Sequence, residues 1–430
     1  MHLSTDLWLL SLMLISPLSG ATPSSQPAHK LSQVYDTTDQ LPLPNKGNIA
    51  VHDPNILLWE NYYYLFKGGV HIPIFRTQNL SGPWEQVGTV LSEESIIDVG
   101  NRSRPWAPTA IQQNGTFYCY YSLSQSGSRD SAIGVATSTS LGGEGEKWTD
   151  HGAVIRTGKG KGSDVWPYNI TNAIDPSFIT DNETGQSYLN FGSFWHDIWQ
   201  VPLSGDLLSV SVSDSEAPDA KQLTFIPGQK SKPEEGSWMN FREGYYYAWF
   251  SHGKCCQFHG GFPARGHEYD IRVGRSESVR GPFLDKNGDK LLDGGGTIVY
   301  ASNHGEVYAP GGLGVLAGND SVPDILYYHY LNTTVGFNNG VSELFVFLFL
   351  FLFLFFLQDS GYKNCDTDFH QEAHLGWNYL RYDDGWPVVL DGIDISSGAG
   401  STLPVPRWVV LTISLSTFHT VQHLNAKFDR

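Results

Sequence analysis

The stretch HDPNILLWENYYYLFKGG, residues 52–69, decides the fold. It starts with an acidic Asp-Pro pair, continues as an apolar run, turns, and returns as a Tyr-rich run. Two short runs of aliphatic and aromatic residues around a polar turn are typical of paired β-strands. This stretch therefore predicts one hairpin whose first strand follows an acidic turn.

The same unit recurs four more times along the chain. Its later starts are Trp106-Ala107-Pro108, Ile174-Asp175-Pro176, Glu235-Gly236-Ser237-Trp238 and Tyr308-Ala309-Pro310. Residues 82–91, 146–155 and 281–288 follow several units and resemble further, outer strands. The spacing of the starts, roughly 55–75 residues, is long for a propeller blade but within reach if the loops are extended. Without helical periodicity, the repeats predict an all-β chain folded as a five-bladed β-propeller; the alternative is a pair of β-sandwiches.

Three of the repeats carry a carboxyl group at their start. In a propeller the first strand of each blade lines the central axis, so Asp53, Asp175 and Glu235 are expected to converge. An Asp-Pro pair alone is also a common turn, and in β-sandwiches these carboxylates would lie at surface turns. Their equivalent positions in three repeats favour a shared site.

The composition excludes several classes of protein. The chain has 430 residues, 17% charged and 13% aromatic, which excludes a disordered or coiled-coil protein. With 27 Lys and Arg against 44 Asp and Glu, the net charge is −17. Nucleic acids and anionic membranes bind basic surfaces, so we expect neither as a partner.

The first residues indicate secretion. Residues 1–21 combine a short apolar run with a small-residue cleavage site, as signal peptides do; the alternative is a buried N-terminal helix. Seven asparagines begin glycosylation sequons: Asn79, Asn101, Asn114, Asn169, Asn182, Asn319 and Asn332. Of the cysteines, Cys119 is expected to be a buried apolar residue. Cys255 and Cys256 form either a vicinal disulfide or two free thiols.

Converging carboxyl groups suit the hydrolysis of glycosidic bonds. One protonated carboxyl delivers a proton to the leaving oxygen, and one carboxylate activates water on the opposite face. A third carboxylate nearby raises the pKa of the acid. Trp106, Phe194 and Trp195 lie beside repeat starts or strand ends, where they either stack on sugars or pack inside blades.

Many stretches of the chain resemble the secreted endo-1,5-α-L-arabinanases of glycoside hydrolase family 43. Among them are VHDPNI (51–56), NAIDPSF (172–178), YLNFGSFW (188–195), EEGSWM (234–239), ARGHEYDIRVGRS (264–276), HGEVYAPGGLGVL (304–316) and GWNYLRYDDGWPVV (376–389). Together, all the resembling stretches cover nearly every residue from Val51 to Val389 except one insertion. The resemblance implies a five-bladed propeller, an inverting mechanism and arabinan as the substrate.

The resemblance also implies a role for each site residue. Asp53 would be the general base, Glu235 the general acid, and Asp175 the residue that tunes and orients Glu235. Asn172, Trp106, Ser193, Phe194 and Trp195 would line the sugar subsites. Strand alternation would point Glu234 away from the axis.

The resemblance implies no cofactor for the chemistry but a calcium or sodium ion on the propeller axis. The usual Gly-Pro-Gly-His form is replaced by Ala309-Pro310-Gly311-Gly312, and His304 is the nearest candidate ligand. We expect a monomer. The alternative functions are an exo-acting α-L-arabinofuranosidase or β-xylosidase, and a carbohydrate-binding propeller without activity.

Residues 341–371 interrupt the resemblance. They contain a Phe/Leu run, Leu344–Leu357, whose 14 residues are short of the ~20 that cross a membrane. A translated intron is our hypothesis, and a lipid- or partner-binding loop or a sequencing error is the alternative. The predicted organisation is a signal peptide (1–21), a lead segment (22–50), a catalytic propeller (51–389) with this insertion, and an atypical tail (390–430).

Overall fold

The computed structural model describes residues 40–47, 49–142, 147–212, 217–228, 233–256, 258, 261–303, 305–319, 322–334 and 373–390. The signal peptide (1–21), most of the lead segment, His304, the insertion (341–371) and residues 391–430 lie outside these ranges. No helix in the described part is long and apolar enough to cross a membrane.

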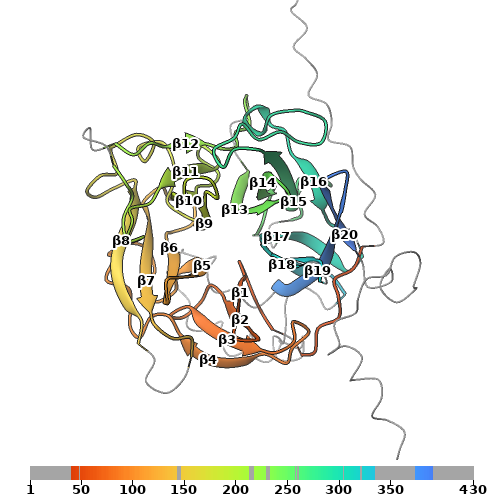
Figure 1. Ribbon diagram of the computed structural model, residues 1–430, viewed down its shortest axis with the longest axis horizontal. Helices are drawn as coiled ribbons and strands as arrows, with labels where there is room; N and C mark the ends of the chain where they lie inside the picture. Colours follow the sequence, from red (N-terminus) through yellow and green to blue (C-terminus); the bar gives the residue numbers. More distant parts are fainter. Residues whose placement is uncertain are drawn as a thin grey trace, which may run out of the picture. The chain divides into compact units, whose positions relative to one another are not determined.

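The described strands form five four-stranded antiparallel sheets arranged in a ring (Figure 1). Blade one contains β1 (Asn55–Trp59), β2 (Tyr62–Phe66), β3 (Pro73–Thr77) and β4 (Glu85–Thr89). Blade two contains β5 (Trp106–Gln113), β6 (Thr116–Leu123), β7 (Ser131–Ser138) and β8 (Thr149–Thr157). Blade three contains β9 (Ser177–Thr180), β10 (Ser187–Phe191), β11 (Trp199–Pro202) and β12 (Lys221–Gln222).

The last two blades follow the same strand order. Blade four contains β13 (Glu234–Arg242), β14 (Tyr245–His252), β15 (Asp270–Ser276) and β16 (Thr297–Tyr300), with a short 3₁₀ helix, η2 (Leu291–Asp293), before β16. Blade five contains β17 (Val307–Leu316), β18 (Asp324–Asn332), β19 (Ala373–Asp383) and β20 (Trp386–Leu390). The five-bladed β-propeller is confirmed, and the β-sandwich alternative is wrong.

One of the three predicted outer strands is misplaced. Residues 82–91 contain β4 and residues 146–155 overlap β8, as expected. Residues 281–288, however, form no strand: Leu284 makes an isolated bridge to Arg275, a turn follows at residues 286–288, and the outer strand of blade four is β16. The carboxylate of Asp285 explains the turn, because it accepts the backbone N–H groups of Asn287 and Asp289.

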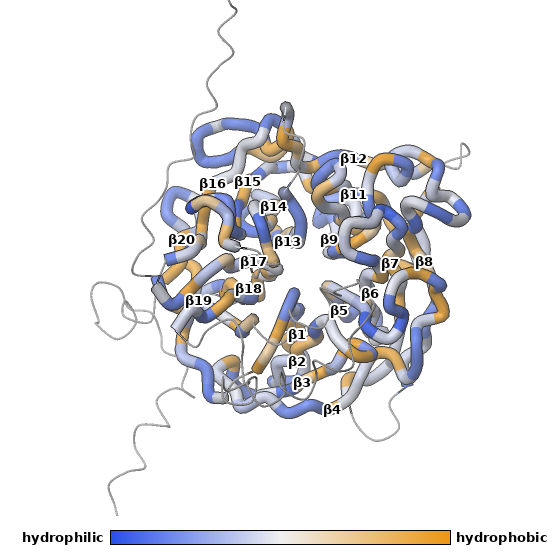
Figure 2. The backbone as a smooth tube through the Cα atoms, turned by 180° about the vertical axis from the view of Figure 1, so that it is seen from behind, coloured by the Kyte–Doolittle hydropathy of each residue, from blue (hydrophilic) through white to orange (hydrophobic). Residues whose placement is uncertain are grey.

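Each blade packs on the next through an apolar cluster, and apolar segments follow the strands of every sheet (Figure 2). Tyr121 and Phe66 join blades two and one, and Trp249 and Tyr328 join blades four and five. Burying aromatic and aliphatic surface is the main favourable term in folding. The aromatic richness of the sequence therefore serves these interfaces between blades.

Blade five completes the ring, and the residues before blade one pair with its strand β19. Its strands β19 and β20 include GWNYLRYDDGWPVV (376–389), which confirms that this segment completes the last blade. The lead segment packs on β19, where the N–H of Leu43 donates to the carbonyl of Trp377 at 2.9 Å; at the start of the propeller, the N–H of Val51 donates to the carbonyl of Ala373 at 2.9 Å. The insertion thus enters between β18 and β19, on the connection that links two paired strands.

Polar contacts near the axis join the innermost strands of blades one to four in sequence. The Asn55 side chain accepts the N–H of Ala110 at 2.9 Å, and Thr109 donates to the Pro176 carbonyl at 2.6 Å. Ser177 and Ser237 share a hydrogen bond of 3.1 Å. The starts of β1, β5, β9, β13 and β17 therefore meet at the centre of the ring (Figure 1).

Candidate active site

A cavity opens where the innermost strands begin. It is lined by residues from all five blades, with Asp53 and Asp175 among them. The other lining residues are Pro54, Asn55, Ala107, Pro108, Thr109, Pro176, Gly236, Ser237, Trp238, Gly312 and Leu313. Asp53 and Asp175 both have positive φ angles, 47° and 55°, in the left-handed region that Asp tolerates better than most residues. This backbone turn precedes Pro and directs both carboxyl groups to one site.

Asp53 is held between two histidines. Its Oδ2 lies 2.9 Å from Nδ1 of His52, and its Oδ1 lies 3.4 Å from Nδ1 of His329. Its backbone N–H donates to Nδ1 of His329 at 3.1 Å. Burial alone would raise the pKa of Asp53, but the contacts with His52 and His329 outweigh burial and hold that pKa well below its ordinary value. Asp53 is therefore an ionised carboxylate across the physiological range.

Glu235 has the opposite character. It is 8% exposed, and the Tyr269 hydroxyl donates a hydrogen bond to its Oε1. Burial raises the pKa of Glu235 to about 7; the hydrogen bonds from Tyr269 and Ser193 oppose the rise, and the charge of Asp53 adds to it. The preceding Glu234 is fully buried and faces His252 at 3.5 Å, which agrees with its expected direction away from the site.

Asp175 holds the backbone next to Glu235. Its Oδ2 accepts the N–H of Gly236, the residue after Glu235, at 3.1 Å. Its own N–H donates to the Ser122 hydroxyl at 2.9 Å, which anchors it to blade two. Burial, followed by the charges of Glu235 and Asp53, raises the pKa of Asp175 well above its usual range. The site thus combines one strongly ionised carboxylate with two that hold protons readily.

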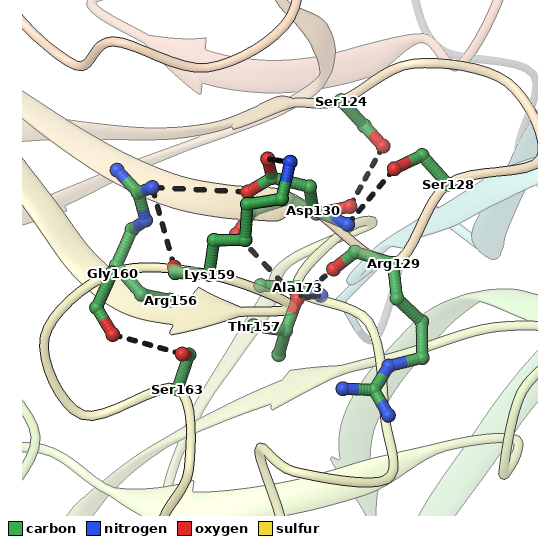
Figure 3. A network of polar contacts seen from close by, with 11 residues as sticks. Ser124, Ser128, Arg129, Asp130, Arg156, Thr157, Lys159, Gly160, Ser163 and Ala173 are labelled. Atoms are coloured by element: carbon green, nitrogen blue, oxygen red, sulfur yellow. Dashed lines mark hydrogen bonds and ion pairs between the residues drawn. The ribbon is translucent and has the colours of Figure 1, made fainter.

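A polar network fixes the loop that carries Asp175 (Figure 3). The Thr157 hydroxyl at the end of β8 donates to the Arg129 carbonyl at 2.8 Å and accepts the N–H of Ala173 at 2.9 Å. Asp130 lies between Arg156 at 3.8 Å and Lys159 at 3.4 Å. These contacts hold the loop against blade two just before it reaches the axis.

The five predicted sugar-binding residues fall into two groups. Asn172 and Ser193 are buried together, with the Asn172 amide donating to the Ser193 hydroxyl at 2.8 Å, and Ser193 also bonds Glu235. Phe194 and Trp195 are exposed, at 36% and 40%, while Trp106 is half-buried at the start of β5. None of the five is among the residues that line the cavity, so their contact with sugars stays a prediction.

Sequence reasoning missed three residues that contact the carboxyl groups. They are His52, His329 and Tyr269. His52 adjoins Asp53 in the chain, so its position beside an acidic repeat start could have indicated that it contacts this carboxylate. His329 lies inside a Tyr-rich strand and Tyr269 precedes β15, and neither position indicates its partner.

The predicted cation ligand, His304, lies outside the described residues. Within them, His52, Asp53 and His329 place potential ligand atoms within 4.8 Å of one another. Calcium and sodium favour oxygen ligands, whereas this group offers two imidazoles and one carboxylate that already contacts both rings. The group does not fit the ion that the resemblance implies, and we derive no chemical step through an ion.

The cysteines behave as two separate cases. Cys255 and Cys256 are joined as a vicinal disulfide, one of the two alternatives left open by the sequence. Cys119 is unpaired and buried in the cluster between blades one and two, as predicted, and burial raises its pKa.

Comparison with known proteins agrees with this geometry. The family model of glycosyl hydrolases family 43 matches residues 47–346. A probable arabinan endo-1,5-alpha-L-arabinosidase D of Emericella nidulans is 49% identical over 96% of each chain. The chain belongs to glycosyl hydrolases family 43. The family resemblance predicted from the sequence is thereby confirmed.

Further relatives are less similar in sequence. The arabinan endo-1,5-alpha-L-arabinosidase B of Emericella nidulans is 43% identical, over 81% of this chain and 85% of its own. A solved arabinanase of Bacillus subtilis superposes with a TM-score of 0.58 at 26% identity, over 80% of this chain and 99% of the other. A solved Cellvibrio cellulosa α-L-arabinanase bound to arabinohexaose has a TM-score of 0.62 at 24% identity, over 82% and 98%, and shares the fold.

Proposed function

We propose that this family 43 protein is an endo-acting hydrolase of α-1,5-linked arabinan that inverts the anomeric configuration. The observation that carries the proposal is the pairing of opposite carboxyl groups at one centre: Asp53 ionised beside two histidines, and Glu235 with a pKa raised to about 7. The names of the relatives with 49% and 43% identity support arabinan and internal cleavage.

In the proposed reaction, the Asp53 carboxylate removes a proton from a water molecule, whose oxygen bonds to the anomeric carbon. The glycosidic C–O bond breaks as the protonated Glu235 transfers its proton to the leaving oxygen. Asp53 ends protonated and Glu235 ionised, so the proton count balances. An inverting enzyme needs its two carboxyl groups about 6.5–9.5 Å apart to admit that water, and we expect this separation here.

Asp175 acts on Glu235 rather than on the sugar in this proposal. Its Oδ2 holds the backbone N–H of Gly236, and in its ionised form its negative charge would favour the protonated form of Glu235. Asn172, Ser193, Phe194, Trp195 and Trp106 would contact the arabinose units. Acid and base both come from the chain, so the proposed chemistry requires no cofactor.

We also propose that the protein is secreted and monomeric. None of the seven sequon asparagines is buried, which agrees with glycosylation of an extracellular protein. The N-terminal sequence of the mature protein would test cleavage after residue 21, and its mass in solution would test the monomer.

Digestion of debranched arabinan tests the proposed activity. We expect mixed arabino-oligosaccharides early in the reaction and, by proton NMR, a first-formed anomer opposite to the substrate linkage. Arabinose alone would indicate exo action, a retained anomer would contradict inversion, and no product would indicate a carbohydrate-binding propeller.

A further inference from the structure

Tyr269 occupies a distinctive position behind the cavity. It precedes β15 and is 3% exposed, and like Glu235 it is not among the residues that line the cavity. Its hydroxyl nevertheless donates a hydrogen bond directly to Oε1 of Glu235. A buried hydroxyl bound to a carboxyl group restricts the position of that carboxyl, because breaking the bond would leave buried polar atoms unsatisfied.

The ring of Tyr269 belongs to a column that reaches Asp53. It stacks on the ring of His329, with centroids 6.1 Å apart and an interplanar angle of 25°. His329 stacks in turn on His52, at 4.1 Å and 23°. Both histidines contact the Asp53 carboxylate. One set of packed rings therefore connects the group on Glu235 with the groups on Asp53.

Two glycines in β17 make room for this column. A side chain at Gly311 would collide with the ring of Tyr269, and one at Gly312 would meet the Asp53 carboxylate and the His329 ring. Gly312 also has a φ of 56°, in the left-handed region that favours glycine. The bulged start of β17 thus accepts the column instead of filling its space.

We propose that Tyr269 is a positioning residue for the general acid: its hydroxyl orients the Glu235 carboxyl, and its ring, through His329, fixes that carboxyl relative to Asp53. The inference rests on the proposed function, in which Glu235 is the acid. It adds a residue that acts through Glu235 and sets the geometry between the general acid and the general base.

The ionisable groups around Glu235 set the sign of the expected pH effect. Asp53 faces it from the start of β1, Asp175 from the start of β9, and Tyr269 from before β15; His329 contacts Tyr269 from β18. The Tyr269 hydroxyl favours the ionised form of Glu235, because a donated hydrogen bond stabilises negative charge. Removing that hydroxyl should therefore raise the pKa of the acid.

The test is Tyr269→Phe, with Tyr246→Phe as its matched control. Tyr246 is also buried in blade four and donates to a carboxylate, Asp181, at 2.7 Å. It lies on β14 at the end of the β13–β14 pair opposite to Glu235. We expect Tyr269→Phe to lower kcat on arabinan by roughly tenfold to a hundredfold, as for a lost hydrogen bond to a charged group, with KM nearly unchanged. The alkaline limb of its kcat/KM profile should move to higher pH. Tyr246→Phe should change neither quantity.

A second variant covers the case in which Tyr269→Phe does not fold. Replacing Tyr269 with 3-fluorotyrosine keeps the ring and supplies a stronger hydrogen-bond donor, so the alkaline limb should move to lower pH. The positioning role would be overturned if the alkaline limb of the kcat/KM profile did not move in either variant. It would also be overturned if Tyr269→Phe changed only KM and thermal stability. Glu235→Gln distinguishes a failure of the proposed function from a failure of this inference. If Glu235→Gln keeps full activity, the proposed function itself is wrong. If Glu235→Gln is inactive but Tyr269→Phe behaves as the wild type does, only the positioning role is rejected.

Discussion

Replacing Glu235 with Gln should stabilise the folded protein, and more so at alkaline pH. Burial raises the pKa of this carboxyl from 4.5 to about 7, so the folded state binds its proton more tightly than the unfolded chain does. Stability from this group is fully present below about pH 4.5 and is lost as the pH rises through about 7. Gln cannot ionise and is free of that loss.

The magnitude follows from the shift of the pKa. The pKa of Glu235 rises from 4.5 in the unfolded chain to about 7 in the folded protein. At about 1.36 kcal/mol per pH unit, this difference costs the folded state about 3 kcal/mol once Glu235 is ionised in both states. We therefore expect Glu235→Gln to gain about 3 kcal/mol relative to wild type at pH 8, and less than about 1 kcal/mol at pH 5.

Urea denaturation at pH 5 and pH 8 measures both differences. Asp181→Asn is the control, because hydrogen bonds from Thr184 and Tyr246 outweigh burial and lower the Asp181 pKa. Asp181 is then ionised at both pH values, so its variant should lose the same stability at each. A Glu235→Gln gain that is absent, or no larger at pH 8 than at pH 5, would refute the assigned pKa and with it the basis for a general acid.

Three further outcomes are expected. The kcat/KM of the wild type for arabinan should fall as the pH rises above about 7, because Glu235 must be protonated in the free enzyme; a profile flat to pH 9 would argue against this acid. Gly312→Ala should lose most activity, since its side chain would displace Asp53 and His329, and a fully active variant would show that the base tolerates movement. Excising residues 341–371 should raise soluble yield, because the segment adds a Phe/Leu run that no described strand needs; equal yield, thermal midpoint and activity in both forms would count against the intron hypothesis.

The repeats made the ring of blades predictable. An apolar run followed by a Tyr-rich run recurs five times, with an acidic start in three of the repeats. Each run became a paired strand because its side chains pack against the next blade. The convergence of Asp53, Asp175 and Glu235 followed from their equivalent repeat positions. The structure adds the environments that distinguish the ionised carboxylate from the protonated one.

Contacts between distant repeats could not be predicted from the sequence. Tyr269 and Glu235 are 34 residues apart, and His329 is 276 residues from Asp53, with no local pattern that pairs them. The misplaced outer strand at 281–288 has a local cause: after one bridge at Leu284, the Asp285 carboxylate accepts backbone N–H groups and the chain turns instead of continuing along β15. Sequence repeats predict which positions reach the axis, while hydrogen-bond partners there depend on the closed ring.

The central claim is that Glu235 protonates the leaving group and Asp53 activates water. Its most direct test compares Glu235→Gln and Asp53→Asn on arabinan and on an aryl arabino-oligoside, whose leaving group needs no proton. We predict that both variants lose nearly all activity on arabinan, and that only Glu235→Gln keeps a large share on the aryl substrate. If Glu235→Gln loses both substrates equally, or if Asp53→Asn still hydrolyses arabinan, the assignment of acid and base is contradicted.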